Sequence, residues 1–195
     1  MSIIGVASAS GVGKTTLIRT FLRTVPYSTL LTSTTTRKPR ESDYHDGSVR
    51  EYEYVTRDKF AQLESDGAFL DTFGEEHKAQ YGTRATIFEQ ALQSSQVFLA
   101  ALYVPGVELF FDEARALHRE SNMHAVFLDL EDEGERRRRL HERGETDLLR
   151  YEDELVRWRN LVAKSDAPFF ILQATESPET LVHKVINKFG IKAEN

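Results

Sequence analysis

The chain has 195 residues, of which 40% are hydrophobic and 29% are charged, and its net charge is −6. This balance predicts one soluble domain with its own core, and it argues against wrapping a nucleic-acid polymer, which needs a basic face. The absence of cysteine excludes disulfides and thiolate chemistry. With no signal-peptide pattern and no apolar run of membrane-spanning length, we expect a cytoplasmic protein without a membrane partner.

Five apolar runs have the length of buried strands, at residues 3–7, 29–32, 97–102, 124–128 and 169–172. Amphipathic segments lie between most of these runs and predict helices at 15–23, 107–118, 154–162 and 179–189. Strands that alternate with helices form βαβ units. We therefore expect an α/β fold with a parallel five-stranded sheet flanked by helices.

Residues 35–84 interrupt this rhythm because they are more polar and richer in aromatic side chains. Short segments at 50–55, 68–73 and 78–81 indicate strands, and residues 57–65 predict a helix that ends at Gly67. We expect a mixed α+β subdomain at 35–84, inserted into a core made of 1–34 and 85–195. A second polar stretch within that core, at 141–157, predicts a lid.

The most informative motif, Ser8-Ala9-Ser10-Gly11-Val12-Gly13-Lys14-Thr15-Thr16, follows the first predicted strand. A strand, a glycine-rich turn and a Lys-Thr pair that opens a helix are typical of loops that hold nucleotide phosphates. The ammonium group of Lys14 can reach the β- and γ-phosphates, and the Thr15 hydroxyl is placed to bind Mg²⁺. Ser8 stands where the strict pattern has glycine, so a plain small-residue turn is the alternative. The predicted ATP-binding residues are Ser10, Gly11, Val12, Gly13, Lys14, Thr15 and Thr16.

Two arginines, Arg37 and Arg40, follow the second predicted strand around a turn that contains Pro39. Guanidinium groups bind phosphate through paired hydrogen bonds, and the hydroxyls of Tyr52 and Tyr81 can complete a phosphate cage. The alternative interpretation is a solvated basic loop.

The segments Thr35-Thr36-Arg37-Lys38-Pro39-Arg40, Tyr52-x-Tyr54-Val55, Gly67-Ala68-Phe69-Leu70-Asp71 and Tyr81-Gly82-Thr83 resemble the monophosphate-binding region of guanylate kinases in order and spacing. With the phosphate loop before them and residues 139–144 after them, the resemblance covers most of the chain. It implies a P-loop NTPase fold and phosphoryl transfer from ATP to a nucleoside monophosphate, GMP or dGMP, with Mg²⁺ as cofactor.

The resemblance also implies roles for single residues. Arg139 and Arg143 match the lid arginines that hold ATP phosphates, while most of the block from Arg136 to Arg139 reads as a solvated helix face. Glu154 stands where the family has a further arginine, a role that Arg150 or Arg157 can fill. The implied catalytic residues are Lys14, Arg139, Arg143 and Arg157. The implied acceptor residues are Ser33, Arg37, Arg40, Tyr52, Asp71, Tyr81, Gly82 and Thr83. Tyr103 joins this predicted set because of its own chemistry and not because of the resemblance.

The sequence departs from the family at the end of the third core strand, where Ala101 and Tyr103 replace an Asp-x-Asp pair. This loss implies slow catalysis, a different base or metal ordering by another group. Asp129 and Glu131 end the fourth strand and are candidates to substitute, although helix capping explains them equally well. Tyr103 can stack on a base or form a hydrogen bond with it.

Two alternatives to a GMP kinase stay open. One is a kinase for another nucleotide or a sugar phosphate, in which the phosphate-binding residues persist and the base-reading residues differ. The other is a non-catalytic module that binds phosphorylated peptides. The expected partners are small-molecule nucleotides rather than a nucleic-acid polymer, and the chain is expected to be a monomer or a homodimer.

Overall fold

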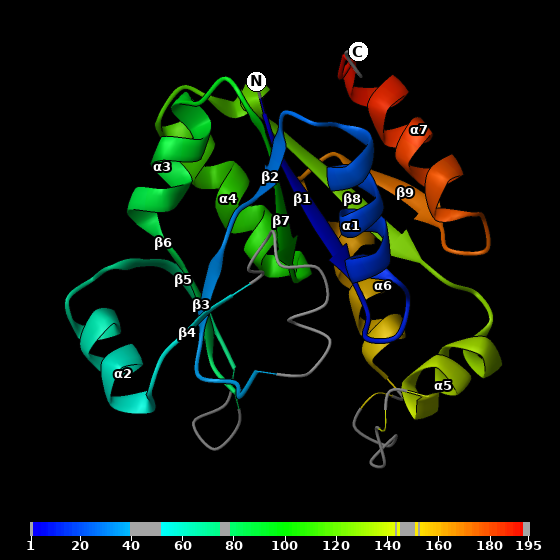
Figure 1. The fold of residues 1–195 in the computed structure, drawn as a ribbon, viewed down its shortest axis with the longest axis horizontal. Helices are drawn as coiled ribbons and strands as arrows, with labels where there is room; N and C mark the ends of the chain where they lie inside the picture. Colours follow the sequence, from blue (N-terminus) through cyan, green and yellow to red (C-terminus); the bar gives the residue numbers. More distant parts are fainter. Residues whose placement is uncertain are drawn as a thin grey trace.

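The computed structural model describes residues 2–39, 52–74, 79–142, 144, 151 and 153–192. Within this part of the chain, the larger sheet has five parallel strands in the order β2-β7-β1-β8-β9 (Figure 1). They are β1 (Ile3–Ser8), β2 (Ser28–Leu30), β7 (Val97–Leu102), β8 (Met123–Asp129) and β9 (Phe169–Gln173). The predicted parallel five-stranded sheet is confirmed.

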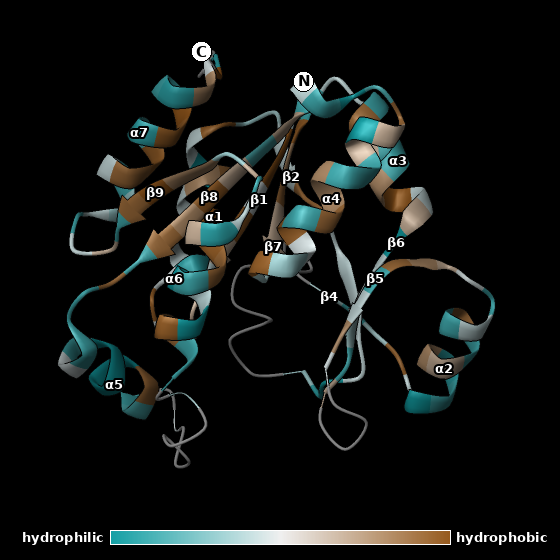
Figure 2. Cartoon of the chain, turned by 180° about the vertical axis from the view of Figure 1, so that it is seen from behind, coloured by the Kyte–Doolittle hydropathy of each residue, from teal (hydrophilic) through white to brown (hydrophobic). Residues whose placement is uncertain are grey.

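Helices cover both faces of this sheet (Figures 1 and 2). Helices α1 (Lys14–Thr24) and α7 (Pro178–Phe189) pack together on one face, and α4 (Val104–Ala116) and α6 (Glu154–Lys164) pack together on the other. The remaining helical elements along the core are α3 (Ala85–Gln93), the short 3₁₀ helix η2 (Glu120–Asn122) and α5 (Glu133–Glu142).

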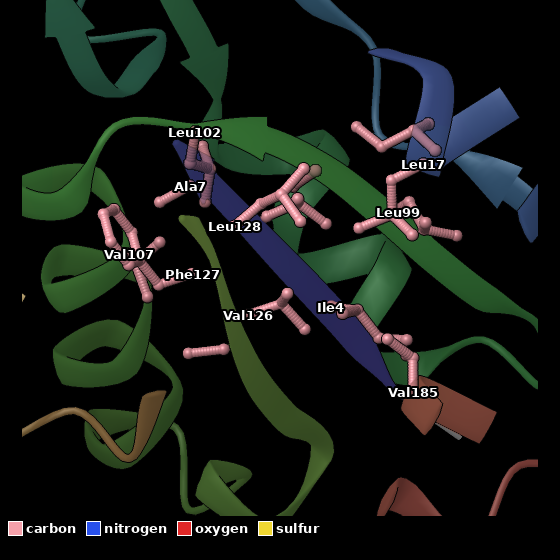
Figure 3. Packing of buried hydrophobic residues seen from close by; sticks show 14 of the residues in the cluster. Ile4, Ala7, Leu17, Leu99, Leu102, Val107, Val126, Phe127, Leu128 and Val185 are labelled. Carbon is pink, nitrogen blue, oxygen red and sulfur yellow. The ribbon is translucent and has the colours of Figure 1, made fainter. Parts of the chain in front are cut away.

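The core is built around β1, whose residues are all buried. Figure 2 shows the strands of the larger sheet as mostly hydrophobic, which is expected when helices cover both faces of a parallel sheet. Figure 3 shows Leu17 of α1 and Val107 of α4 packing against side chains of β1, β7 and β8. This packing fixes the carboxyl ends of β1 and β7, where the loops that carry functional groups begin.

A smaller mixed sheet with the strand order β4-β3-β6-β5 lies beside the core. Its strands are β3 (Ser33–Thr35), β4 (Tyr52–Tyr54), β5 (Phe69–Phe73) and β6 (Tyr81–Arg84), and α2 (Arg57–Ser65) connects β4 to β5. Phe60 of α2 is fully buried and stacks on Phe69 at 4.6 Å between ring centroids. A Cβ atom on Gly82 would lie 2.8 Å from the Phe69 ring, so glycine is required where β6 crosses this ring.

Several predicted boundaries differ from the structure. The helix predicted at 107–118 begins earlier, at Val104, and has Pro105 in its first turn. Proline is tolerated there because the N–H groups of the first turn have no hydrogen-bond partner within the helix. The strand predicted at 78–81 is displaced, because β6 runs from Tyr81 to Arg84 and pairs antiparallel with β5; residue 78 lies outside the described residues. The helix predicted at 57–65 is confirmed, and Gly67 follows it with a φ of 66°.

No helix in the described ranges is long and apolar enough to cross a bilayer.

Candidate active site

A cavity of about 600 Å³ lies where the core meets the smaller sheet. The phosphate loop contributes Lys14 and Thr15 to its wall, and the smaller sheet contributes residues from all four of its strands. The structure thus brings two separately predicted sets of residues to one cavity. The predicted residues that line it are Ser10, Gly11, Gly13, Lys14, Thr15, Ser33, Tyr52, Asp71, Tyr81, Gly82, Thr83, Tyr103 and Arg157.

The phosphate loop connects β1 to α1 and depends on two glycines in the left-handed region. Gly11 has a φ of 80° and Gly13 a φ of 124°, values that side chains with a Cβ rarely adopt. A Cβ atom on Gly11 would also lie 2.9 Å from Leu140 Cγ. Helix α1 begins directly after Gly13 with no side-chain cap. Its first N–H groups are therefore arranged as in helix N-termini that bind anions.

The two polar side chains that follow in the motif lie on the wall of this cavity. The Lys14 ammonium donates a hydrogen bond of 3.0 Å to the carbonyl oxygen of Leu102, the last residue of β7. Thr15 lies in the first turn of α1 and supplies a hydroxyl oxygen, a ligand type that suits Mg²⁺. Among the described residues, no group of three or more His, Asp or Glu side chains is placed to hold a metal ion.

Three other predicted ATP-site residues line a second cavity, of about 330 Å³, on the far side of the loop: Val12, Thr16 and Arg139. Arg139 donates a 2.8 Å hydrogen bond from Nη1 to the Val12 carbonyl oxygen and another of 2.8 Å from Nε to Glu135 Oε1. Apolar side chains, among them Leu17 and Pro178, form much of the remaining wall. The phosphate loop therefore separates two cavities, and Gly13 contributes to both.

Asp71 is a buried carboxylate that the smaller sheet contributes to the main cavity. Its Oδ1 accepts a hydrogen bond of 3.0 Å from the backbone N–H of Thr83, its cross-strand neighbour in β6. Burial raises the pKa of the Asp71 carboxyl, and the hydrogen bonds from Thr83 oppose this effect only in part. The sheet register thus brings Asp71 and Thr83 together as a paired acceptor and donor.

Tyr103, which directly precedes α4, lines the same cavity from the core. Its ring stacks on Phe73 of β5, with 4.2 Å between centroids and 27° between planes. Burial, with a smaller contribution from the charge of Asp71, raises the pKa of Tyr103 to about 12, so its hydroxyl stays protonated at neutral pH. Phe73 is not among the predicted site residues, and its only local signal in the sequence is its place at the end of a predicted strand.

Arg37 packs on two tyrosine rings of β4, one of which, Tyr52, lines the cavity. Its guanidinium carbon lies 5.1 Å from the centre of the Tyr52 ring and 5.7 Å from that of Tyr54. The Tyr52 and Tyr81 rings meet edge to face at 5.8 Å. The structure thus groups Arg37 with the two tyrosines of the predicted phosphate cage. Arg40, Arg143 and Arg150 lie outside the described residues, as does much of the predicted lid.

Two charged residues, Arg136 and Asp129, differ from an interpretation that the sequence allowed. Most of the block from Arg136 to Arg139 was predicted to be a solvated helix face, and Arg136 does not fit this prediction: its side chain is 1% exposed and donates to the carbonyl oxygens of Ser10 (3.3 Å) and Tyr151 (2.5 Å). Asp129 faces away from the main cavity, because Arg159 binds its carboxylate at 2.9 Å and both residues line a third cavity. This leaves Asp129 unsuited to replace the missing aspartates.

Two aromatic and basic neighbours at the start of α6 complete the cavity wall. Trp158 was interpreted as a core residue, and the structure confirms this while also placing it on the cavity wall. The Arg157 guanidinium carbon lies 5.1 Å from the centre of the Trp158 ring. Arg157 is therefore held at the cavity by a cation–π contact.

Comparison with known proteins identifies curated guanylate kinases as relatives. The chain is 34% identical to that of Ralstonia nicotianae over 129 residues, which is 65% of this chain and 53% of that protein. It is 30% identical to that of Caulobacter vibrioides over 165 residues, 80% of this chain and 72% of that protein. It is also 30% identical to that of Anaeromyxobacter dehalogenans over 167 residues, 84% of this chain and 66% of that protein. The chain thus spans about half to three quarters of these relatives' lengths.

The crystal structure of guanylate kinase from Anaplasma phagocytophilum has the same fold. It superposes with a TM-score of 0.68 at 17% identity, over 100% of this chain and 87% of that chain. This likeness, together with the sheet order, confirms the predicted P-loop NTPase fold. The guanylate kinase family model matches residues 1–187. Because that match covers nearly the whole sequence, the chain belongs to the guanylate kinase family.

Proposed function

We propose that this protein is an ATP-dependent nucleoside monophosphate kinase that converts GMP or dGMP to the diphosphate. The observation that carries the proposal is the single cavity whose wall holds Lys14 and Thr15 of the phosphate loop together with Asp71 and Thr83 of the smaller sheet. A donor triphosphate and an acceptor monophosphate that share one cavity can meet without diffusing through water. The family of the chain and the names of its relatives support the same activity.

The donor side is supported by the chemistry of the phosphate loop. Backbone N–H groups of the loop and of the first turn of α1 would hold the phosphates of ATP. The Lys14 ammonium would leave the Leu102 carbonyl for the β- and γ-phosphates, and Arg139 would contribute a second cation. The second cavity, with Leu17 and Pro178 in its wall, offers an apolar site for the adenine base.

The Thr15 hydroxyl fits Mg²⁺ as one oxygen ligand, with phosphate oxygens and water completing the shell. When bound with ATP, Mg²⁺ neutralises charge on the phosphates. The described carboxylates on the wall of the main cavity are Asp71, Asp153 and Glu154, whereas Ala101 and Tyr103 provide none. Thr15 is the residue of the phosphate loop that we assign to the ion.

The acceptor side matches the hydrogen-bonding edge of guanine. Guanine presents two donors, its N1–H and its amino group, and the Asp71 carboxylate can accept both. The Thr83 hydroxyl would donate to the guanine O6. Arg37 and Arg40, with the hydroxyls of Tyr52 and Tyr81, would bind the phosphate of the monophosphate. Ser33 and Gly82 line the same wall.

In the reaction, an oxygen of the acceptor phosphate forms a bond to the γ-phosphorus of ATP. The bond between that phosphorus and the β–γ bridging oxygen breaks, and ADP leaves with the electron pair. No general base is required, because the acceptor oxygen is already anionic. Lys14, Arg139, Arg143 and Arg157 would stabilise the charge that spreads over the transferred group. Closure of the predicted lid, 141–157, would exclude water.

A coupled assay for ADP release over a panel of nucleoside and sugar monophosphates tests this proposal. We expect turnover with GMP and dGMP and little with other acceptors. Turnover with only non-guanine acceptors would contradict the assigned substrate and preserve the reaction class.

A second candidate function is a binding module for phosphorylated peptides, favoured by the replacement of the two aspartates with Ala101 and Tyr103. Titration calorimetry with ATP and Mg²⁺ separates the two functions, because a scaffold has no need of the donor site. Absence of ATP binding would favour the peptide-binding module, and micromolar to millimolar binding would favour the kinase.

A further inference from the structure

Two charged side chains from α5 and α6 bind the phosphate loop at Ser10. We propose that Arg136 and Glu154 are positioning residues, which set the conformation of the phosphate loop through Ser10 and thereby set the affinity for the donor nucleotide. This inference rests on the proposed function, because it takes ATP as the nucleotide that the phosphate loop binds. It concerns how the loop is held rather than which groups touch the phosphates.

Glu154 binds the donor groups of Ser10 with both of its carboxylate oxygens. The Ser10 N–H donates to Glu154 Oε2 at 3.0 Å, and the Ser10 hydroxyl donates to Oε1 at 3.2 Å. The indole N–H of Trp158, one helical turn later in α6, donates to Oε1 at 3.3 Å. Because Leu155 and Trp158 anchor α6 in the core, the Glu154 carboxylate is held on a rigid helix.

Arg136 binds the acceptor group of the same residue from the other helix. Its Nη1 donates to the Ser10 carbonyl oxygen at 3.3 Å, its Nη2 to the Tyr151 carbonyl oxygen at 2.5 Å and its Nε to Glu133 at 3.0 Å. Its Nη1 also lies 3.7 Å from Glu154 Oε2. A guanidinium that is 1% exposed is stable only with such partners. All three polar groups of Ser10 are thus occupied by one ion pair.

This arrangement acts on the loop because Ser10 directly precedes Gly11, the first of the two loop glycines. Glycines at positive φ give a loop access to many backbone conformations. Fixing the N–H, hydroxyl and carbonyl of Ser10 removes part of that freedom before the nucleotide binds. Preorganisation of this kind raises affinity by lowering the ordering cost of binding. Ser10 is then an anchor of the loop, which leaves Lys14 and the backbone of the helix start to contact phosphates.

The charges of the pair have a further consequence. Glu154 lines the main cavity together with Lys14 and Thr15, so an unpaired carboxylate there would repel the anionic nucleotide. Arg136 neutralises Glu154 from the buried side. Removing Arg136 alone should therefore harm donor binding more than removing both charges. A purely structural contribution would instead lower thermal stability and the affinity for GMP in the same order.

The test is titration calorimetry of the full chain with ATP and Mg²⁺, and separately with GMP, with thermal unfolding measured for each variant. Replacing Glu154 with alanine (Glu154→Ala) removes both Ser10 contacts and should raise the Kd for ATP about tenfold, as expected for hydrogen bonds to a charged group. Glu154→Gln keeps one acceptor oxygen and should change this Kd by about threefold or less. The Kd for GMP should stay within about twofold in both variants.

A second pair of variants tests the charge effect. Arg136→Met keeps much of the buried volume and should raise the Kd for ATP more than tenfold, while Arg136→Met with Glu154→Gln should recover part of that loss. The matched control is Glu120→Gln, which breaks the exposed ion pair with Arg115 and should leave every Kd unchanged. If Arg136→Met does not fold, the two Glu154 variants still decide the proposal.

Several outcomes would overturn the inference. An unchanged or lower Kd for ATP in Glu154→Ala would show that Glu154 does not position the loop or that it competes with the phosphates. A parallel loss of ATP and GMP affinity that tracks the loss of thermal stability would show a purely structural contribution. Failure of the proposed function is distinguishable, because a wild-type protein that binds ATP without phosphorylating any acceptor leaves the comparison of ATP affinities intact.

Discussion

Replacing Asp71 with asparagine should lower activity with GMP and raise thermal stability at neutral pH. Asp71 Oδ1 is occupied by the Thr83 N–H at 3.0 Å, and an asparagine oxygen can accept the same bond. The NH₂ group of the asparagine would then face the N1–H and amino groups of guanine. Because all of these groups are hydrogen-bond donors, no hydrogen bond could form between them. Losing charged hydrogen bonds to the base should cost about 2–3 kcal/mol. Since each 1.4 kcal/mol is a factor of ten, kcat/KM for GMP should fall about 30- to 150-fold.

The stability effect has the opposite sign because burial raises the pKa of the Asp71 carboxyl above its ordinary value of 3.8. A raised pKa in the folded state means that the charged carboxylate destabilises the fold, and this penalty grows as the pH rises from 3.8 through the raised value. Asparagine carries no such penalty. Asp71→Asn should therefore melt at a higher temperature than the wild type at pH 7.5, and the difference should shrink as the pH is lowered.

Steady-state kinetics with GMP and thermal unfolding across pH measure both effects on one variant. Guanine does not react, so the loss should appear mainly in KM. Unchanged kcat/KM would refute the guanine-reading role of Asp71. A lower melting temperature at pH 7.5 would refute the reasoning about burial, because it would mean that the charged carboxylate stabilises the fold.

Lys14→Ala should lower kcat at least about 100- to 1,000-fold with an unchanged circular dichroism spectrum, and near-normal turnover would exclude a role for this ammonium in the transition state. Gly13→Ala places a Cβ at a φ of 124° and should destabilise the fold by about 1–3 kcal/mol, measured by urea unfolding; an unchanged midpoint would show that the loop has another conformation. Phe73→Ala removes the stack on Tyr103 and, with Phe73 44% exposed, should cost less than about 1.5 kcal/mol in stability while raising the KM for GMP. An unaltered KM would separate this aromatic pair from acceptor binding.

The features predicted well from the sequence are those that depend on local chemistry. The apolar run of β1 and the glycines and lysine that follow it lie within fourteen residues, and each residue type has a direct physical reason at its position. The end of α2 at Gly67 is equally local, since a positive φ after a helix favours glycine.

The features that were missed or misplaced depend on partners far along the chain. The position of β6 follows from its register with β5, in which Asp71 faces Thr83. Arg136 stands in a run of four arginines that reads as a surface, yet its partner Ser10 lies 126 residues away in sequence. Phe73 acquires its stack only when the smaller sheet approaches the start of α4. Pairings of this kind are fixed by tertiary packing, which local pattern does not encode.

The two connections between the smaller sheet and the core restrict how the smaller sheet can move relative to the larger one. The chain leaves β2 through Leu31, which is 2% exposed and bonded to the backbone of Leu99, and enters β3 one residue after Thr32. The chain returns to the core at the end of β6, which α3 follows with no residue between them. Phe88 of α3 packs against Phe110 with 4.6 Å between the ring centroids. Both covalent attachments are thus anchored on the core side (Figure 1). At the second attachment, the Ala85 N–H donates to the Ala68 carbonyl oxygen at 3.1 Å, which ties the start of α3 to the segment before β5. A movement of the smaller sheet should therefore change the backbone torsions at Thr32 more than those at the start of α3.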